Sequence, residues 1–225
     1  MSTLQDLIAD IKAEAKSAAS WTGDTVISER VLRVMAEVPR EEFVPPELRH
    51  SAFEDHPLPI GHGQTISQPY IVALMTELLQ LTADDVVLDV GTGSGYQAAV
   101  LSRLAKQVYG LENVAALARE ARQRLRHLGY NNVEVAWGNA FAGLPQYAPF
   151  DAILVAAAPE RIPAALVEQL APGGRLVVPV GARYYGQDLR LVRKDAGGEI
   201  TVKSILPVAF VPLIDQILND EAISP

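Results

Sequence analysis

The chain has 225 residues, 49% of them hydrophobic and 20% charged, which is enough to bury the core of one α/β domain. Its 27 acidic and 19 basic residues give a formal charge of −8, and the basic residues are scattered, which argues against a nucleic-acid partner. The absence of cysteine excludes disulfides, thiolate zinc sites and a cysteine nucleophile. Residues 1–20 are too polar for a signal peptide and no apolar run reaches membrane-spanning length, so we expect a cytoplasmic protein without a membrane partner.

Two helices are expected near the N-terminus, because apolar residues recur at helical spacing over residues 4–11 and 31–38. The following segment, Pro39 to Pro69, is rich in Pro and Gly, which favours an extended lid or cleft wall over regular secondary structure. We expect a single domain over residues 1–225. In it, residues 1–69 supply the N-terminal helices and this segment, and residues 70–225 supply an α/β core and C-terminal strands.

Strand-like and helical runs alternate after a helix that begins near Pro69. The expected strands are 86–90, 107–111, 133–137, 151–156 and 175–180, and the helices between them are 96–105, 113–128 and 162–170. This alternation is typical of an α/β fold with a doubly wound, mainly parallel sheet. A short polar turn separates the last runs, 189–192 and 200–208, and predicts an antiparallel hairpin at the far end of the sheet.

A glycine-rich turn follows the expected strand 86–90, where residues 86–96 read VVLDVGTGSGY. Glycines at 91, 93 and 95 allow a tight turn and close approach of a ligand, and the helix after them presents unpaired N–H groups. Tyr96 stands where the dinucleotide fingerprint has its last glycine, and no Lys-Ser/Thr pair follows, so phosphate binding is disfavoured.

Glu112 closes the next strand, 21 positions after Gly91, where a carboxylate in such folds accepts hydrogen bonds from ribose hydroxyls. The glycine turn and this carboxylate together predict a nucleoside ligand without a pyrophosphate. The alternative is that the glycines only form a strand-to-helix turn and that Glu112 only caps a helix or faces solvent. The strand, the helix and the spacing in combination favour the ligand site.

The sequence VLDVGTGSGY followed by Glu112 resembles the first two cofactor motifs of class I S-adenosylmethionine-dependent methyltransferases. The resemblance implies a Rossmann-like methyltransferase fold, S-adenosylmethionine as cofactor and S-adenosylhomocysteine as product. The positions that match cofactor-binding residues in these motifs are Asp89, Gly91, Thr92, Gly93, Ser94, Gly95 and Glu112.

Further segments narrow the resemblance to the protein-L-isoaspartate O-methyltransferase family. They are LPIGHGQTISQP at 58–69, APGGRLVVPVG at 171–181, VPREEFV at 38–44, FDAI at 150–153 and FVPL at 210–213. The resemblance covers nearly the whole chain, and Thr65-Ile66-Ser67-x-Pro69 is its most specific part. It implies an enzyme that methylates the free carboxylate of L-isoaspartyl residues in damaged proteins and peptides, with 39–69 and the C-terminal strands forming a peptide cleft. We expect the chain to be a monomer.

Ser67 is the candidate catalytic residue. In the family the matching serine is treated as the active-site residue, and Thr65 and Ser67 lie beside the methionine end of the cofactor. A hydroxyl there could donate to the substrate carboxylate and hold one oxygen in line with the methyl group. No strong general base is required, because a carboxylate with a pKa of about 4 is already ionised at neutral pH. The alternative, compatible with this role, is that Ser67 caps the helix that begins near Pro69.

The four histidines are weaker candidates. His62 lies in a glycine-rich loop and could orient the substrate, although an exposed or structurally bonded histidine is the commoner outcome. The others, His50, His56 and His127, have no metal-ligand spacing, so we predict no metal.

One motif departs from the family pattern. After the third strand the family usually has Gly-Asp-Gly, whose aspartate contacts the adenine amino group, whereas this chain has Gly138-Asn139-Ala140. Asn139 can still accept through its side-chain oxygen, so we assign it to cofactor binding; the alternative is a simple turn residue.

Two other functions compete with isoaspartyl methylation. One is a methyltransferase for a different carboxylate, in a particular peptide or small molecule. The other is a non-catalytic module that binds S-adenosylmethionine, suggested by the change at Asn139 and Ala140. Binding without methyl transfer to any isoaspartyl peptide would favour the second of these.

Overall fold

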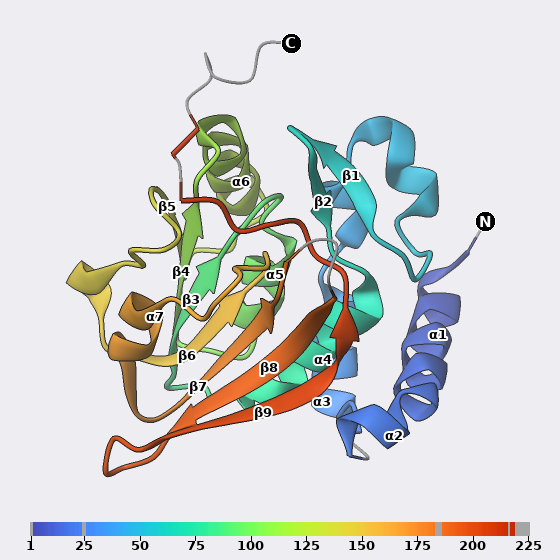
Figure 1. Cartoon of the computed structure of the whole chain (residues 1–225). Helices are drawn as coiled ribbons and strands as arrows, with labels where there is room; N and C mark the ends of the chain where they lie inside the picture. Colours follow the sequence, from blue (N-terminus) through green and yellow to red (C-terminus); the bar gives the residue numbers. More distant parts are fainter. Residues whose placement is uncertain (1, 24–25, 183–185, 216, 219–225) are drawn as a thin grey trace.

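A seven-stranded sheet runs through the middle of the computed structural model, which describes residues 2–23, 26–182, 186–215 and 217–218 (Figure 1). The strand order is β5-β4-β3-β6-β7-β8-β9, in which β3 to β7 are parallel and β8 and β9 are antiparallel to their neighbours. The strands are β3 (Val86–Val90), β4 (Gln107–Glu112), β5 (Val133–Trp137), β6 (Phe150–Val155), β7 (Leu170–Val180), β8 (Gln187–Lys194) and β9 (Ile200–Val208). The predicted parallel sheet and C-terminal hairpin are confirmed.

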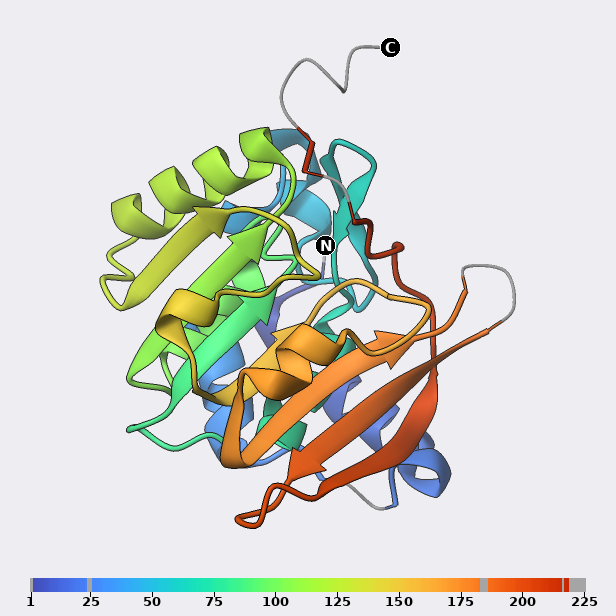
Figure 2. The same cartoon turned by 60° about the vertical axis from the view of Figure 1, so that its left-hand side comes forward.

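Helices cover both faces of the sheet (Figure 2). They are α4 (Pro69–Leu79), α5 (Tyr96–Ser102), α6 (Ala115–His127), the 3-10 helix η3 (Pro145–Tyr147) and α7 (Ala164–Glu168). Alternate residues of β6 enter separate cores, because successive side chains of a strand point to opposite faces. Leu154 packs in the core that includes α4 and α5, whereas Ile153 packs in the core that includes Leu166 of α7. The doubly wound arrangement is therefore confirmed.

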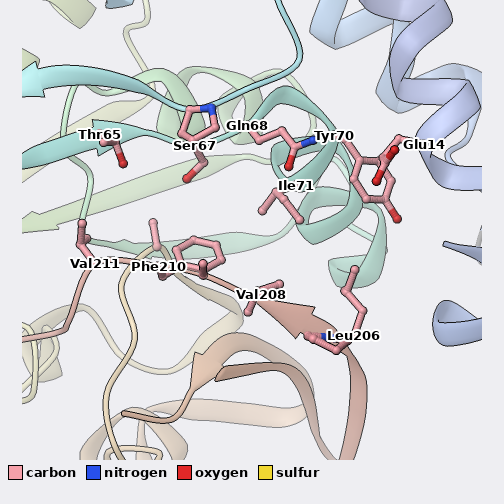
Figure 3. Close-up of a pocket in the computed structure, with 14 residues that line it drawn as sticks. Glu14, Thr65, Ser67, Gln68, Tyr70, Ile71, Leu206, Val208, Phe210 and Val211 are labelled. Atoms are coloured by element: carbon pink, nitrogen blue, oxygen red, sulfur yellow. The ribbon is translucent and has the colours of Figure 1, made fainter. Parts of the chain in front are cut away.

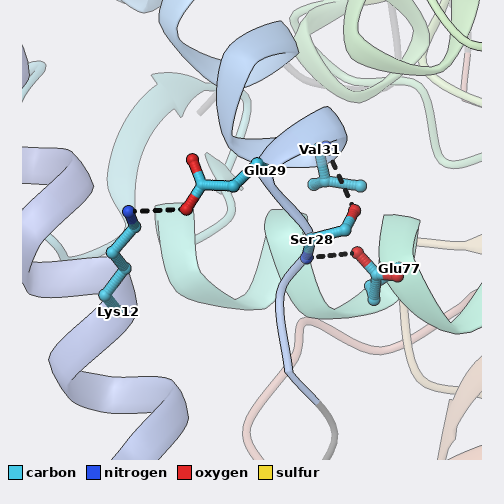
Figure 4. Close-up of polar contacts among 5 residues, drawn as sticks. All are labelled: Lys12, Ser28, Glu29, Val31 and Glu77. Carbon is cyan, nitrogen blue, oxygen red and sulfur yellow. Dashed lines mark hydrogen bonds and ion pairs between the residues drawn. The ribbon is translucent and has the colours of Figure 1, made fainter.

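The N-terminal helices pack against α4. The two predicted helices are α1 (Leu4–Ser17) and α3 (Glu29–Glu37), and the short α2 (Ala19–Thr22) lies between them. Ser28 caps α3 by accepting from the Val31 N–H at 3.3 Å, and its own N–H donates to Glu77 of α4 at 2.8 Å (Figure 4). Lys12 of α1 bonds to Glu29 of α3 at 2.8 Å, so polar contacts join all three helices.

The segment from Pro39 to Pro69 is more regular than its composition predicts, and the expectation of a purely extended segment was wrong. It contains two 3-10 helices and a β-hairpin, namely η1 (Arg40–Phe43), η2 (Pro46–Ser51), β1 (Leu58–Gly61) and β2 (Gln64–Ile66). The positive φ angles at Gly61, His62 and Gly63 close the hairpin, and Leu58 and Ile66 bury its inner face. Tertiary packing thus orders strands that are too short to be recognised by periodicity.

Strand β7 begins five residues before its predicted start at Arg175. Leu170 already pairs with Phe150, and a register irregularity separates this pair from that of Ala152 and Arg175. A bulge inside a strand resembles a turn in the sequence, because both use Pro and Gly. Among the described residues, none of the helices has the length and apolar character required to cross a membrane.

Candidate active site

The glycine turn ties the ends of β3 and β4 together. Gly91, Gly93 and Gly95 all have positive φ angles of 54° to 92°, a backbone conformation that side chains disfavour. The Gly91 N–H donates to the Leu111 carbonyl at 2.8 Å, and the Gly93 N–H donates to Oε2 of Glu112 at 2.8 Å. The turn is therefore held by the residues that end the neighbouring strand.

The Glu112 carboxylate is buried beside this turn, with a relative exposure of 4%. Its other oxygen, Oε1, accepts from the Val114 N–H at 2.9 Å, next to the start of α6. Burial raises the pKa of Glu112, and the N–H groups of Val114 and Gly93 oppose that shift. The Asn113 N–H is a third donor to this carboxylate. A carboxylate has about four acceptor sites, so the cap-like contact and ribose binding are compatible.

Asp89 lies behind the glycine turn and is fully buried. Its carboxylate oxygens have no hydrogen-bond partner among the described residues. Burial raises the pKa of Asp89 to about 7, and the nearby Thr92 hydroxyl opposes this shift. The hydrogen bond that the Thr92 hydroxyl donates goes to the backbone carbonyl of Asp89, at 3.1 Å. Asp89 lines neither of the two cavities described below, so its contact with a cofactor stays a prediction.

A narrow cavity of about 40 Å³ lies in front of the turn. Its lining includes Gly91, Gly93, Glu112 and Ala140, and residues 211–214 form the opposite side. Two backbone hydrogen bonds of 2.8 Å hold that segment, from Ala158 N–H to the Val211 carbonyl and from Leu213 N–H to the Ala158 carbonyl. The C-terminal segment therefore lies across the carboxyl ends of the parallel strands.

Asn139 lies at the same edge of the sheet and uses both ends of its side-chain amide. The Nδ2 group donates to Oδ1 of Asp215 at 2.6 Å, and Oδ1 accepts from the Phe141 N–H at 2.8 Å. Asn139 is therefore a turn residue that also contacts the C-terminal segment. Its oxygen retains one acceptor site, so contact with adenine stays a prediction.

A larger cavity, of about 530 Å³, contains the Ser67 side chain (Figure 3). Thr65, Ser67 and Tyr70 line one side, and residues 206–211 line the other. Thr65, Ala156 and Val211 line both this cavity and the narrow one, so the two adjoin at these residues.

The Ser67 hydroxyl does not cap α4. The N-cap residue of that helix is Gln68, without a side-chain cap bond. None of the hydrogen bonds that join the described residues involves Ser67, and its hydroxyl points into the cavity in Figure 3. The capping interpretation is therefore wrong, and the hydroxyl is available for a ligand.

The histidines lie apart from the two cavities. His62 is exposed at the tip of the β1–β2 hairpin, and its charge has a minor lowering effect on the pKa of Glu112. The His56 ring contacts Glu54 at 2.7 Å and the Pro57 carbonyl at 2.9 Å. Within the described ranges, no group of three His, Asp or Glu side chains could hold a metal ion.

Sequence reasoning missed several residues of the larger cavity. Tyr70 and Ile71 of α4 line it, as do Glu14 of α1 and Ala156 after β6. Tyr70 and Ile71 directly follow the Thr65–Pro69 motif and could have been inferred from the first turn of the helix. Glu14 gives no such signal, because only the packing of α1 beside α4 brings it to the cavity.

The sequence profile of the family described as protein-L-isoaspartate(D-aspartate) O-methyltransferase matches residues 20–218. A protein-L-isoaspartate O-methyltransferase 2 from Polaromonas sp. is 51% identical over 210 residues, which are 93% of this chain and 100% of that protein. The protein of the same name from Syntrophobacter fumaroxidans is 50% identical over 207 residues, 92% of this chain and 84% of its own.

Solved structures agree with the sequence relatives. A protein-L-isoaspartate O-methyltransferase superposes with a TM-score of 0.81 at 26% identity, over 96% of this chain and 67% of that one. A Plasmodium falciparum protein solved in complex with S-adenosyl-L-homocysteine has the same fold, with a TM-score of 0.78 at 24% identity and coverage of 96% and 100%.

Proposed function

This chain belongs to the protein-L-isoaspartate(D-aspartate) O-methyltransferase family, and on that premise we propose how its residues carry out the reaction. The enzyme transfers a methyl group from S-adenosylmethionine to the free carboxylate of isoaspartyl residues in damaged proteins and peptides, which starts their repair. The observation that supports this site is that the two cavities adjoin at Thr65, Ala156 and Val211. A methyl donor in one cavity and a peptide in the other would meet at these residues.

The narrow cavity is the cofactor site in this proposal. Glu112 accepts from the ribose with the acceptor capacity that the three backbone N–H groups leave. Small-molecule pockets usually measure roughly 300–1,000 Å³, so we propose that residues 211–214, which line the narrow cavity, move outward when the cofactor binds.

The larger cavity takes the peptide, and Ser67 orients its carboxylate. The Ser67 hydroxyl donates to one carboxylate oxygen and leaves the other directed toward the cofactor, which supplies an electrophilic methyl group. The Thr65 side chain lies where the cavities meet and helps to position the same group. The substrate carboxylate is ionised at neutral pH, so alignment and exclusion of water, rather than proton removal, provide the rate enhancement.

The proposal is tested with one peptide in its isoaspartyl and aspartyl forms. The two forms have the same composition and charge, so only the position of the carboxylate relative to Ser67 distinguishes them. We expect labelling from S-adenosylmethionine to favour the isoaspartyl form by about 10²-fold or more, the usual scale for a displaced reacting group. We also expect no acid limb in the rate between pH 6 and 7, because the carboxylate is already ionised.

Other outcomes would identify the competing functions. Equal labelling of both forms would indicate a methyltransferase for carboxylates in general. Tight cofactor binding without labelling of either form would indicate a binding module or a different acceptor.

We further propose that residues 1–225 act as one monomeric, cytoplasmic domain without nucleic-acid or membrane partners. The net charge of −8 and the scattered basic residues support the absence of nucleic acid. Light scattering at micromolar concentration tests the oligomeric state; a mass of twice 24.3 kDa would contradict the monomer.

A further inference from the structure

Asp55 bonds to the residues that follow Ser67, although it lies in a different loop. Its Oδ1 accepts from the Tyr70 N–H at 2.8 Å, and its Oδ2 accepts from Nε2 of Gln68 at 2.9 Å. Both partners lie within three positions of Ser67. One carboxylate thus fixes the backbone and a side chain at the start of α4.

Helix α4 needs this external acceptor because its own sequence provides none. The first N–H groups of a helix have no partner within the helix. Gln68 is the N-cap but makes no side-chain cap bond, and Pro69 has no N–H, so the Tyr70 N–H is the first that requires an acceptor. The negative charge of Asp55 is also favourable at a helix N-terminus. Since Asp55 performs the capping, the hydroxyl of Ser67 is left free to face the cavity.

A buried arginine supports the Asp55 loop from behind. Arg40 is 1% exposed, and its Nη2 lies 3.4 Å from the carbonyl of His56, the residue after Asp55. Burial lowers the pKa of Arg40, whereas Tyr96 and Asp55 oppose that shift, so its charge is close to both. Its guanidinium lies 5.0 Å from the ring centroid of Tyr96, the first residue of α5 after the glycine turn. The loop that orients Ser67 is therefore packed against the element that begins at the cofactor turn.

We propose that Asp55 is a positioning residue for methyl transfer. By capping α4 in place of Ser67, it holds the Ser67 hydroxyl at the point where the peptide carboxylate meets the methyl donor. This inference rests on the proposed function, because Asp55 can matter for methyl transfer only if Ser67 orients the substrate carboxylate.

The test compares kcat with cofactor affinity in three variants. Asp55→Ala should lower kcat about 10-fold or more, while the Kd for S-adenosylmethionine stays within about 3-fold, because misalignment of a reacting group acts on turnover. Asp55→Asn should recover most of kcat, because the new amide oxygen still accepts from the Tyr70 N–H. The Gln68 side-chain amide can rotate by half a turn, so that its oxygen accepts from the new amide N–H group. In a Ser67→Ala background, Asp55→Ala should have little further effect on kcat.

Asp85→Ala is the matched control. Asp85 also accepts two hydrogen bonds from a loop, one from the Thr82 N–H at 2.9 Å and one from the Thr82 hydroxyl at 2.7 Å. It lies just before β3, at the end of that strand opposite the glycine turn. Its loss should leave kcat within about 2-fold of the wild type, because the reacting group is not moved. Should Asp55→Ala not fold, Gln68→Ala removes one of the two bonds and should lower kcat several-fold.

Several results would overturn the positioning role. The first is an unchanged kcat in folded Asp55→Ala. The second is that Asp55→Ala lowers kcat as much in the Ser67→Ala background as in the wild type. The third is that Asp55→Asn has a kcat no higher than that of Asp55→Ala. If instead Ser67→Ala itself retains full kcat, or the wild type does not label isoaspartyl peptides, the proposed function fails as well.

Discussion

The two halves of the site are built differently. In the proposed cofactor half, Asp89, the glycine turn and Glu112 come from two adjacent parallel strands. The Gly91 N–H donates to the Leu111 carbonyl, and the Gly93 N–H donates to the Glu112 carboxylate. In the substrate half, Ser67 lies between a hairpin and a helix, opposite residues 206–211 and near Glu14, which come from the two ends of the chain. The Ser67 loop is fixed by the carboxylate of Asp55 from a separate loop, whereas the carboxylate at the glycine turn belongs to the adjacent strand of the sheet.

This difference predicts different consequences of mutation. Under the proposed function, changes in the cofactor half should act on binding, because its groups would contact the cofactor from a rigid sheet edge. Changes in the substrate half should act on turnover, because its groups would align the reacting carboxylate. The following variants test that division, in order of decreasing expected effect.

Gly93→Val should abolish measurable binding of S-adenosylmethionine. The φ angle of Gly93 is +54°, which a β-branched residue adopts at a large cost, and an added Cβ would lie 3.2 Å from Cδ1 of Ile60. Calorimetry measures the binding. The control is Gly198→Val, at a glycine with φ +87° and no atom within 4 Å of an added Cβ, and this variant should bind the cofactor normally. If folded Gly93→Val binds within a few-fold of the wild type, the proposed cofactor site is wrong.

Ser67→Ala should lower kcat by about 10²-fold and leave the Kd of the cofactor nearly unchanged. The hydroxyl has no structural hydrogen bond to lose among the described residues, so the melting temperature should also stay close to the wild-type value. Single-turnover labelling of an isoaspartyl peptide measures the effect. A normal kcat would remove Ser67 from the reaction.

Glu112→Gln should weaken cofactor binding by roughly 10-fold, because hydrogen bonds to a charged group contribute about 1.5–3 kcal/mol. Gln also places an N–H group against the Gly93 or Val114 N–H, so some loss of stability is expected. The control is Glu134→Gln on β5, an exposed position that should bind normally. If kcat fell instead of affinity, the division between the two halves would be wrong.

Asp89→Asn should flatten the pH dependence of stability. The folded-state pKa of about 7 is above the unfolded value of about 4, so the folded state binds the proton more tightly. The resulting stabilisation is full below about pH 4 and is lost as pH rises toward 7, by at most about 1.4 kcal/mol per pH unit. Urea unfolding of the apo-protein at pH 5, 6, 7 and 8 measures the slope. Parallel curves for the two proteins would contradict a neutral, buried Asp89.

Local patterns in the sequence determined the cofactor half and the parallel sheet. A buried strand, a glycine turn and a helix follow one another within 86–102, and Glu112 ends the next strand, so a regular alternation was enough to bring them together. The Thr65–Pro69 motif indicated the proposed reacting end of the site only through its resemblance to a family, and Thr65 and Ser67 do line the larger cavity.

Tertiary structure alone decided how the substrate half is assembled. The hairpin at 58–66 is too short to show a period, and β7 contains a register irregularity at a Pro-Gly-Gly stretch that resembles a turn. Glu14 reaches the cavity only through the packing of α1. The helix cap shows the limit most clearly: proximity in sequence suggested Ser67, whereas the acceptor is Asp55, 15 residues before Tyr70. Hydrogen bonds between distant segments depend on how the loops fold back, and no local propensity encodes that path.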